Sequence, residues 1–164
     1  MAKKVLPKAP VVTKSRVVTN RQLQAAIESI NKLIVERSLF GTQNAFALAR
    51  IAVSIESAYK PAAAVIDRFR KETQESIQKV AEEFKKNNPE IGEEDEINLN
   101  NYPKIQKQAN KLSSEFNAKV EELLDLEVEI EYIPLNLDVF KDKDGEDVNM
   151  DLGTPISFMP FMKE

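Results

Sequence analysis

Residues 43–86 read QNAFALARIAVSIESAYKPAAAVIDRFRKETQESIQKVAEEFKK, and this stretch decides the fold. Its apolar residues recur every three or four positions, which is typical of an amphipathic helix with one core-facing stripe. The stripe consists of Leu48, Ile51, Ile55, Tyr59, Ala62, Ile66, Phe69, Ile77, Val80 and Phe84. Such a helix would extend over about 60 Å, which is too long for a domain of this size to bury along its whole length. Pro61 has no amide hydrogen, so we expect a kink or a break there.

Two shorter helices are predicted, one on each side of this stretch. Thr19 and Gln22 have the spacing of a capping box at the start of the first helix, which should end near residues 37–38, just before Gly41. Pro103 fits the first turn of another helix, which follows a polar, acidic connection and continues to about residue 124. We expect this last helix to pack antiparallel on the second half of the long one.

The period changes from helical to alternating after Leu126. Glutamates alternate with apolar and aromatic residues over positions 127–132, which indicates a half-buried strand. A β-hairpin is predicted next, with Asp144-Gly145 as its turn. The final residues, 156–162, are apolar, and we expect them to pack either on the chain's own core or on a partner.

The sequence therefore predicts a mainly α fold. We expect a helical hairpin or three-helix bundle built on a long kinked helix, with a small C-terminal antiparallel β element. Three regions follow from the pattern: an extended basic N-terminal arm (residues 1–18), a helical domain (19–126), and a small β element with an apolar tail (127–164).

Composition argues against most kinds of catalysis. The 164 residues include no histidine and no cysteine, which removes the commonest general base, the thiolate nucleophiles and the commonest metal ligands. The acidic run Asp142–Asp147 lacks the glycine and glutamate spacing of a calcium loop, because Gly145 is its fourth residue. We predict no enzyme activity, no catalytic residue, no cofactor, no metal and no small-molecule substrate. The apolar runs are too short for a membrane span, so no membrane partner is expected.

The two ends of the chain are the predicted partner surfaces. The arm is basic and rich in valine, and the tail carries Phe and Met side chains that suit adaptable contacts. The predicted partner-binding residues are Lys3, Lys4, Lys8, Lys14, Arg16, Val17, Phe158, Met159, Phe161 and Met162. Two alternatives for the arm stay open, a disordered tail and a nucleic-acid contact made through phosphates. A protein partner is favoured over nucleic acid, because the rest of the chain is acidic and the formal net charge is −4.

Several short runs follow one another along the chain: Phe46-Ala47-Leu48-Ala49-Arg50 leading to residues 62–72, Phe116-Asn117 through Glu122-Leu123-Leu124, Val128-Glu129-Ile130-Glu131, and Ile133-Pro134-Leu135. Their order resembles a group of small uncharacterised proteins encoded by tailed bacteriophages. The resemblance covers roughly residues 40–140, where two helices precede an acidic alternating strand, and the basic arm, the first helix and the Asp144-Gly145 hairpin depart from it.

The resemblance carries no catalytic residues, and the departures from it leave room for a virion component, for which extended arms that reach into neighbours are natural. We therefore expect a non-enzymatic, phage-type structural or assembly protein in an oligomeric virion assembly. Its partners would be copies of itself or other virion proteins, and its location the virion or the cytoplasm of an infected bacterial host. Two alternatives are a small soluble inhibitor or regulator that binds one host protein through its acidic face, and nucleic-acid binding through the arm.

Overall fold

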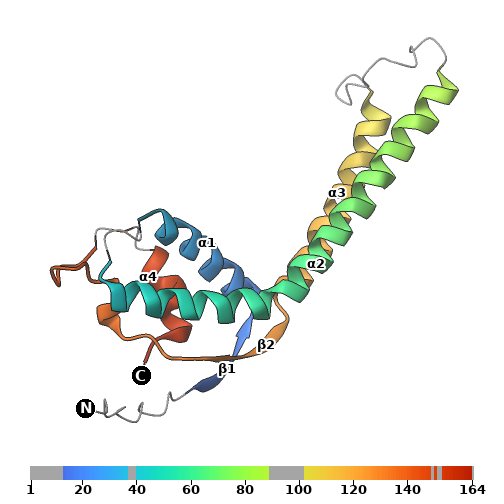
Figure 1. Cartoon of the computed structure of the whole chain (residues 1–164). Helices are drawn as coiled ribbons and strands as arrows, with labels where there is room; N and C mark the ends of the chain where they lie inside the picture. The colour runs from blue at the N-terminus through green and yellow to red at the C-terminus, as the bar shows by residue number, and fades with distance from the viewer. Residues whose placement is uncertain (1–12, 37–39, 89–101, 149, 151–152, 164) are drawn as a thin grey trace, which may run out of the picture. The chain divides into compact units, whose positions relative to one another are not determined.

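The computed structural model describes residues 13–36, 40–88, 102–148, 150 and 153–163. The fold is mainly helical with one small antiparallel sheet, as predicted (Figure 1). The chain divides into two compact units: unit 1 comprises residues 1–59 and 127–164, and unit 2 comprises residues 60–126. Helix α2 (Thr42–Asn87) contributes to both units.

Unit 1 contains the larger core. It is built from β1 (Lys14–Thr19), α1 (Asn20–Glu36), the first part of α2, β2 (Glu127–Tyr132), the 3-10 helix η3 (Leu137–Phe140), α4 (Gly153–Phe158) and the 3-10 helix η4 (Met159–Phe161). Helices α1 and α4 pack together, and the hydroxyl of Ser157 donates to Ser29 Oγ across their contact (2.8 Å). The largest side chains with almost no exposure are Leu23, Ile51, Ile55, Phe158 and Phe161.

The start of α1 confirms the predicted capping box. The amide of Thr19 donates to Gln22 Oε1 (2.9 Å), and the amide of Gln22 donates to Thr19 Oγ1 (3.3 Å). Val18 and Leu23, which flank this box, are both buried in the core. The reciprocal bonds satisfy amide donors that the first helical turn would otherwise leave without partners, so the chain passes directly from β1 into α1.

The predicted strand at 127–132 forms, but its partner is not in the C-terminal region. Strand β2 pairs antiparallel with β1, with Lys14 opposite Tyr132 and Thr19 opposite Glu127. Residues 14–18 therefore belong to a sheet within the chain and are not part of a free arm. A half-buried strand needs a hydrogen-bonded neighbour, and Pro134, which lacks an amide hydrogen, lies two residues after the end of β2.

The predicted turn at Asp144-Gly145 is present, but the hairpin around it is much shorter than predicted. Residues 137–140, expected in its first strand, form η3, and the pairing across the turn is the isolated antiparallel bridge between Lys141 and Asp147. Asp142 Oδ1 accepts hydrogen bonds from the amides of Asp144 (2.8 Å) and Glu146 (3.0 Å). Gly145 has φ +87°, a conformation that glycine adopts without a Cβ clash.

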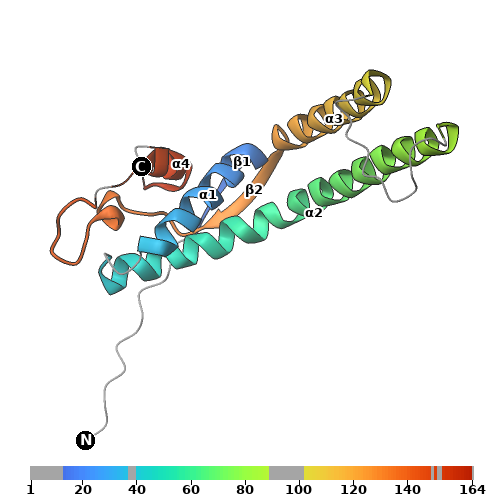
Figure 2. The same ribbon diagram turned by 90° about the horizontal axis from the view of Figure 1, so that it is seen from above.

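Unit 2 is a helical hairpin, as predicted. The second part of α2 and α3 (Pro103–Leu124) lie side by side and antiparallel (Figures 1 and 2). The rings of Phe84 and Tyr102 are 4.8 Å apart at one end, and Lys119 Nζ lies 5.5 Å from the centre of the Phe69 ring. Helix α2 continues through Pro61 without interruption, so a break at this proline is excluded, while a kink there stays a prediction.

Candidate protein-interaction surfaces

The C-terminal tail packs mainly on the core of its own chain. Residues 153–161 form α4 and then η4, and residues three positions apart in such short helices lie on the same face. Phe158 and Phe161 are fully buried on that face, 5.8 Å from the Phe140 ring and 5.5 Å from the Tyr132 ring respectively. The tail was expected to pack either on the chain's own core or on a partner. The structure places these two phenylalanines in the chain's own core, so they are not a partner surface.

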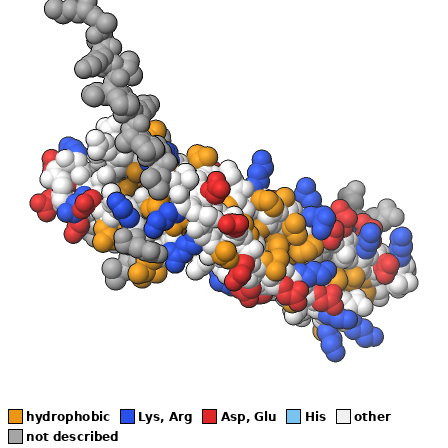
Figure 3. Space-filling model, turned by 90° about the horizontal axis from the view of Figure 1, so that it is seen from below, with side chains coloured by type: hydrophobic (Ala, Val, Ile, Leu, Met, Phe, Trp, Pro, Cys, Tyr) orange, Lys and Arg blue, Asp and Glu red, His pale blue; other side chains and the backbone are white. Residues whose placement is uncertain are grey.

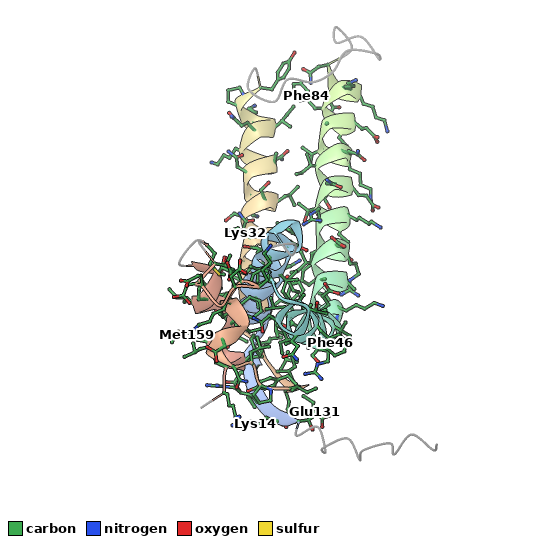
Figure 4. All side chains as sticks on the ribbon, turned by 60° about the vertical axis from the view of Figure 1, so that its left-hand side comes forward. Lys14, Lys32, Phe46, Phe84, Glu131 and Met159 are labelled. Carbon is green, nitrogen blue, oxygen red and sulfur yellow. The ribbon has the colours of Figure 1, made fainter. Side chains whose placement is uncertain are left out.

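Met159 is the exposed member of the predicted tail set. Its side chain is 66% exposed and lies at the outside of unit 1 (Figure 4). Met162 is half-buried and packs against the core cluster. The sequence pattern did not separate these methionines from the phenylalanines, because an apolar run interrupted by Pro160 has no period long enough to define one face.

The two ends, predicted as separate surfaces, contact each other. Arg16 Nη1 donates to the carbonyl oxygen of Pro160 (2.9 Å), and the Tyr132 hydroxyl donates to the same oxygen (3.3 Å). The amide of Leu135 donates to the Phe161 carbonyl (3.0 Å), and the amide of Lys163 donates to the Leu135 carbonyl (2.7 Å). Backbone and side-chain bonds therefore attach the tail to the sheet region of unit 1.

The remaining arm residues have different placements. Lys14 is exposed, and Val17 is 56% exposed on the outer face of β1, where Ser15 Oγ donates to Glu129 Oε1 (2.6 Å). Lys3, Lys4 and Lys8 lie outside the described residues. The structure thus leaves Lys14 and Val17 accessible, while it uses Arg16 in a contact within unit 1.

An apolar groove that the sequence did not predict lies between α1 and α2 in unit 1. Its volume is about 300 Å³, and its lining includes Ile30 and Leu33 from α1 and Ala52 and Val53 from α2. Val53 is 64% exposed, and Phe46 lies seven residues before it on the same helix and is 63% exposed. Seven residues is about two helical turns, so the spacing of Phe46 and Val53 in the sequence could have predicted a second apolar face on α2.

Unit 2 has apolar residues that its two helices only half bury. Nine of the half-buried apolar side chains of α2 and α3 in unit 2 define what we call the hairpin seam: Ile66, Phe69, Ile77, Val80, Phe84, Leu112, Phe116, Val120 and Leu123. Among the described residues of this unit, only Ala62, Ile105, Ala109 and Leu124 are buried. Figure 3 shows apolar side chains gathered on one face of the hairpin, between acidic and basic ones. Figure 4 shows the two helices from another side, with Phe84 at one end.

A groove of about 210 Å³ lies along the middle of the hairpin seam. Its apolar lining is Phe69 from α2 and Leu112 and Phe116 from α3, and its polar lining includes Glu72 and Glu115. The described part of unit 2 consists of two helices, with no third helix or strand to cover such a groove. The seam is therefore apolar surface that the described residues of unit 2 leave partly exposed to solvent.

The acidic turn near residue 144 uses its own backbone amides as partners. The Asp142 carboxylate, which belongs to the run examined as a calcium loop, is occupied by backbone amides of its own turn. No group of three or more histidine, cysteine, aspartate or glutamate residues is placed to hold a metal ion in the part of the chain described. Across that same part, no helix has both the length and the hydrophobicity needed to span a membrane.

Comparisons of the chain with protein-family models, with curated proteins and with solved structures gave no match.

Proposed function

We propose that this chain is a non-enzymatic structural or assembly protein that acts through protein–protein contacts in an oligomer. The tailed-phage resemblance of its helices and acidic strand supports a virion assembly as the setting. The partners would be further copies of the chain or other virion proteins, in the particle or in the cytoplasm of an infected bacterium.

One observation supports this proposal: the apolar stripe of α2 is longer than the core that the described residues supply to cover it. Leu48, Ile51 and Ile55 in unit 1 are buried, but the stripe from Ile66 to Phe84 in unit 2 stays half-exposed. Apolar surface of this extent is unfavourable in water and marks a contact site when it is contiguous. An assembly protein would cover such a stripe with a neighbour.

The arm and the tail contribute less to partner binding in this proposal than the sequence indicated. Phe158 and Phe161 stabilise unit 1 itself, and Arg16 bonds to Pro160. Of the described members of the original set, Met159, Val17 and Lys14 are exposed and within reach of a partner. The contact surface therefore moves from the ends of the chain to the faces of α2 and α3.

The test is the size of the native complex in cells that naturally produce the protein. Lysate is separated by sedimentation, and the chain is located by quantitative mass spectrometry after mild crosslinking. Sedimentation well ahead of a protein of 18.6 kDa, with crosslinks from lysines of unit 2 such as Lys71, supports an assembly function. A chain that sediments as a free monomer throughout the production cycle would contradict it.

A further inference from the structure

The hairpin seam carries an inference that rests on the proposed function and names the partner. The seam runs along both helices of unit 2, and its groove between Phe69 and Phe116 is open among the described residues of that unit. Two more helices would complete a four-helix bundle, in which each helix buries its apolar stripe against two neighbours. A second molecule has to supply these two further helices.

The charges beside the seam change sign along α2. Residues 60–71 contain four basic residues and one acidic residue, whereas residues 72–83 contain one basic and four acidic residues. Salt bridges within the helix are few near this change, with Arg70 to Asp67 at 2.7 Å and Arg68 to Glu72 at 3.7 Å. A helix with this pattern is complementary to its own copy when the two run antiparallel.

Helix α3 has the same kind of pattern. Residues 103–114 contain three lysines and no acidic residue, and residues 115–124 contain three glutamates and one lysine. The residues that carry this pattern on α3 are exposed: Lys104, Lys107, Lys111, Glu115, Lys119, Glu121 and Glu122. An antiparallel copy of α3 would therefore place the lysine-rich half of each helix opposite the glutamate-rich half of the other.

The two sign changes lie at the same level of the hairpin. Phe84 contacts Tyr102, and Lys119 lies over Phe69, and these two contacts align the helices along their length. The step from Lys71 to Glu72 on α2 then lies beside the step from Ser114 to Glu115 on α3. Glu72 and Glu115 both line the groove in the middle of the seam. A single two-fold axis at this level therefore places the basic half of each helix opposite the acidic half of its copy, for α2 and for α3 alike.

We propose that a second copy of the chain packs on the hairpin seam. Its hairpin lies antiparallel and face to face with the first, so that α2 lies over α2, α3 lies over α3, and a four-helix bundle results. Such an interface is isologous, as in most homodimers. The seam residues supply its apolar contact, and the charges of α3 select the orientation.

A parallel pairing would also bring opposite charges together, with α2 over α3 of the other copy. It would, however, place the two connections between α2 and α3 at the same end. The sequence of each connection, residues 88–102, has five acidic residues and no basic one, so two of them would repel. Repulsion of this kind favours the antiparallel pairing.

The experiment measures the mass of the purified full-length protein by light scattering and sedimentation equilibrium, with two triple variants. Variant A carries Lys104→Glu, Lys107→Glu and Lys111→Glu, and variant B carries Glu115→Lys, Glu121→Lys and Glu122→Lys. All six residues are exposed, so circular dichroism should show unchanged helix content. A control variant carries Lys143→Glu and Lys163→Glu, two exposed positions of unit 1.

The wild type and the control should be dimers, whereas A alone and B alone should associate at least tenfold more weakly. Variant A has an almost wholly acidic α3 and variant B a wholly basic one, so an equal mixture should recover association as a mixed dimer. Recovery is specific to the α3-over-α3 pairing, because the parallel pairing gives the mixture no advantage over each variant alone.

Three results would overturn the inference: a wild type that stays monomeric, variants A and B that associate as well as the wild type, or variants whose mixture fails to recover. A wild type that forms oligomers unaffected by either variant contradicts this interface and leaves the assembly function standing. A wild type that is monomeric when purified but sediments in a large complex in native lysate also contradicts this interface and leaves the assembly function standing. In that case a different protein would be the partner of the seam.

Discussion

At the scale of single residues, the tail shows how close neighbours on the chain differ in role. Phe161 is fully buried against Tyr132, whereas Met159, two residues earlier, is 66% exposed. Replacing Phe161 by alanine leaves a cavity in unit 1, and we expect a loss of about 3–5 kcal/mol in the free energy of unfolding. Met159→Ala should change it by less than about 0.5 kcal/mol. Urea titration followed by circular dichroism measures both, and equal, small effects would return the tail to the partner surfaces.

Two adjacent valines of strand β1 also differ in exposure and therefore in role. Val18 is 3% exposed and faces the core, while Val17 is 56% exposed on the other face. Threonine has nearly the shape of valine and keeps the strand preference, so Val18→Thr adds little more than a buried hydroxyl, at a cost of about 1–3 kcal/mol. Val17→Thr should be neutral to within about 0.5 kcal/mol. If Val17→Thr proves the more destabilising in urea titration, the register of β1 on β2 is wrong.

At the scale of elements, the sequence predicted each helix whose position is determined by residues close together in the chain. The 3.6-residue period and the caps predicted the helices at 43–86 and from Pro103, and the Thr19–Gln22 box predicted the start of α1. The neighbour of β2 could not be predicted in this way, because its pairing with β1 joins residues more than 100 positions apart. Both strands show the right local pattern, but nothing in that pattern names a distant partner.

Helix α2 permits a prediction about Pro61, which lies inside it without an amide to donate. Pro61→Ala restores one helical hydrogen bond and removes the ring clash, worth about 3 kcal/mol in a helix interior. Part of this gain is lost because alanine leaves the unfolded chain freer, so we expect a net stabilisation of roughly 2 kcal/mol in urea unfolding.

The matched control for this substitution is Ala64→Gly, at an exposed position one turn further along α2. It should destabilise by about 1 kcal/mol, which shows that unfolding reports on this part of the helix. A Pro61→Ala protein less stable than the wild type would mean that the fold requires the backbone geometry imposed by the proline.

At the scale of the whole molecule, the two units differ in how much of their apolar surface they bury. The core cluster lies entirely in unit 1, and it includes Leu23, Ile55, Phe158 and Phe161 at zero exposure. The sequence predicted part of this difference, because the stripe of α2 is too long for one small domain to bury. It did not show which half of the α2 stripe would stay partly exposed, since that depends on β2 and the C-terminal residues packing against the first part of the chain.

This difference predicts how amide hydrogen exchange depends on protein concentration. Amides of α2 near Ile51 and Ile55 should exchange slowly at every concentration, because the core of their own chain protects them. Amides near Ile77 and Val80, whose side chains are half-buried, should depend on the second copy. If the hairpin opens only after the dimer dissociates, protection there should rise about threefold for each tenfold rise in concentration, since the free-chain fraction of a dimer falls as the square root. Protection near Ile77 that is independent of concentration, and equal to that near Ile55, would show that the two helices of unit 2 are stable without a neighbour.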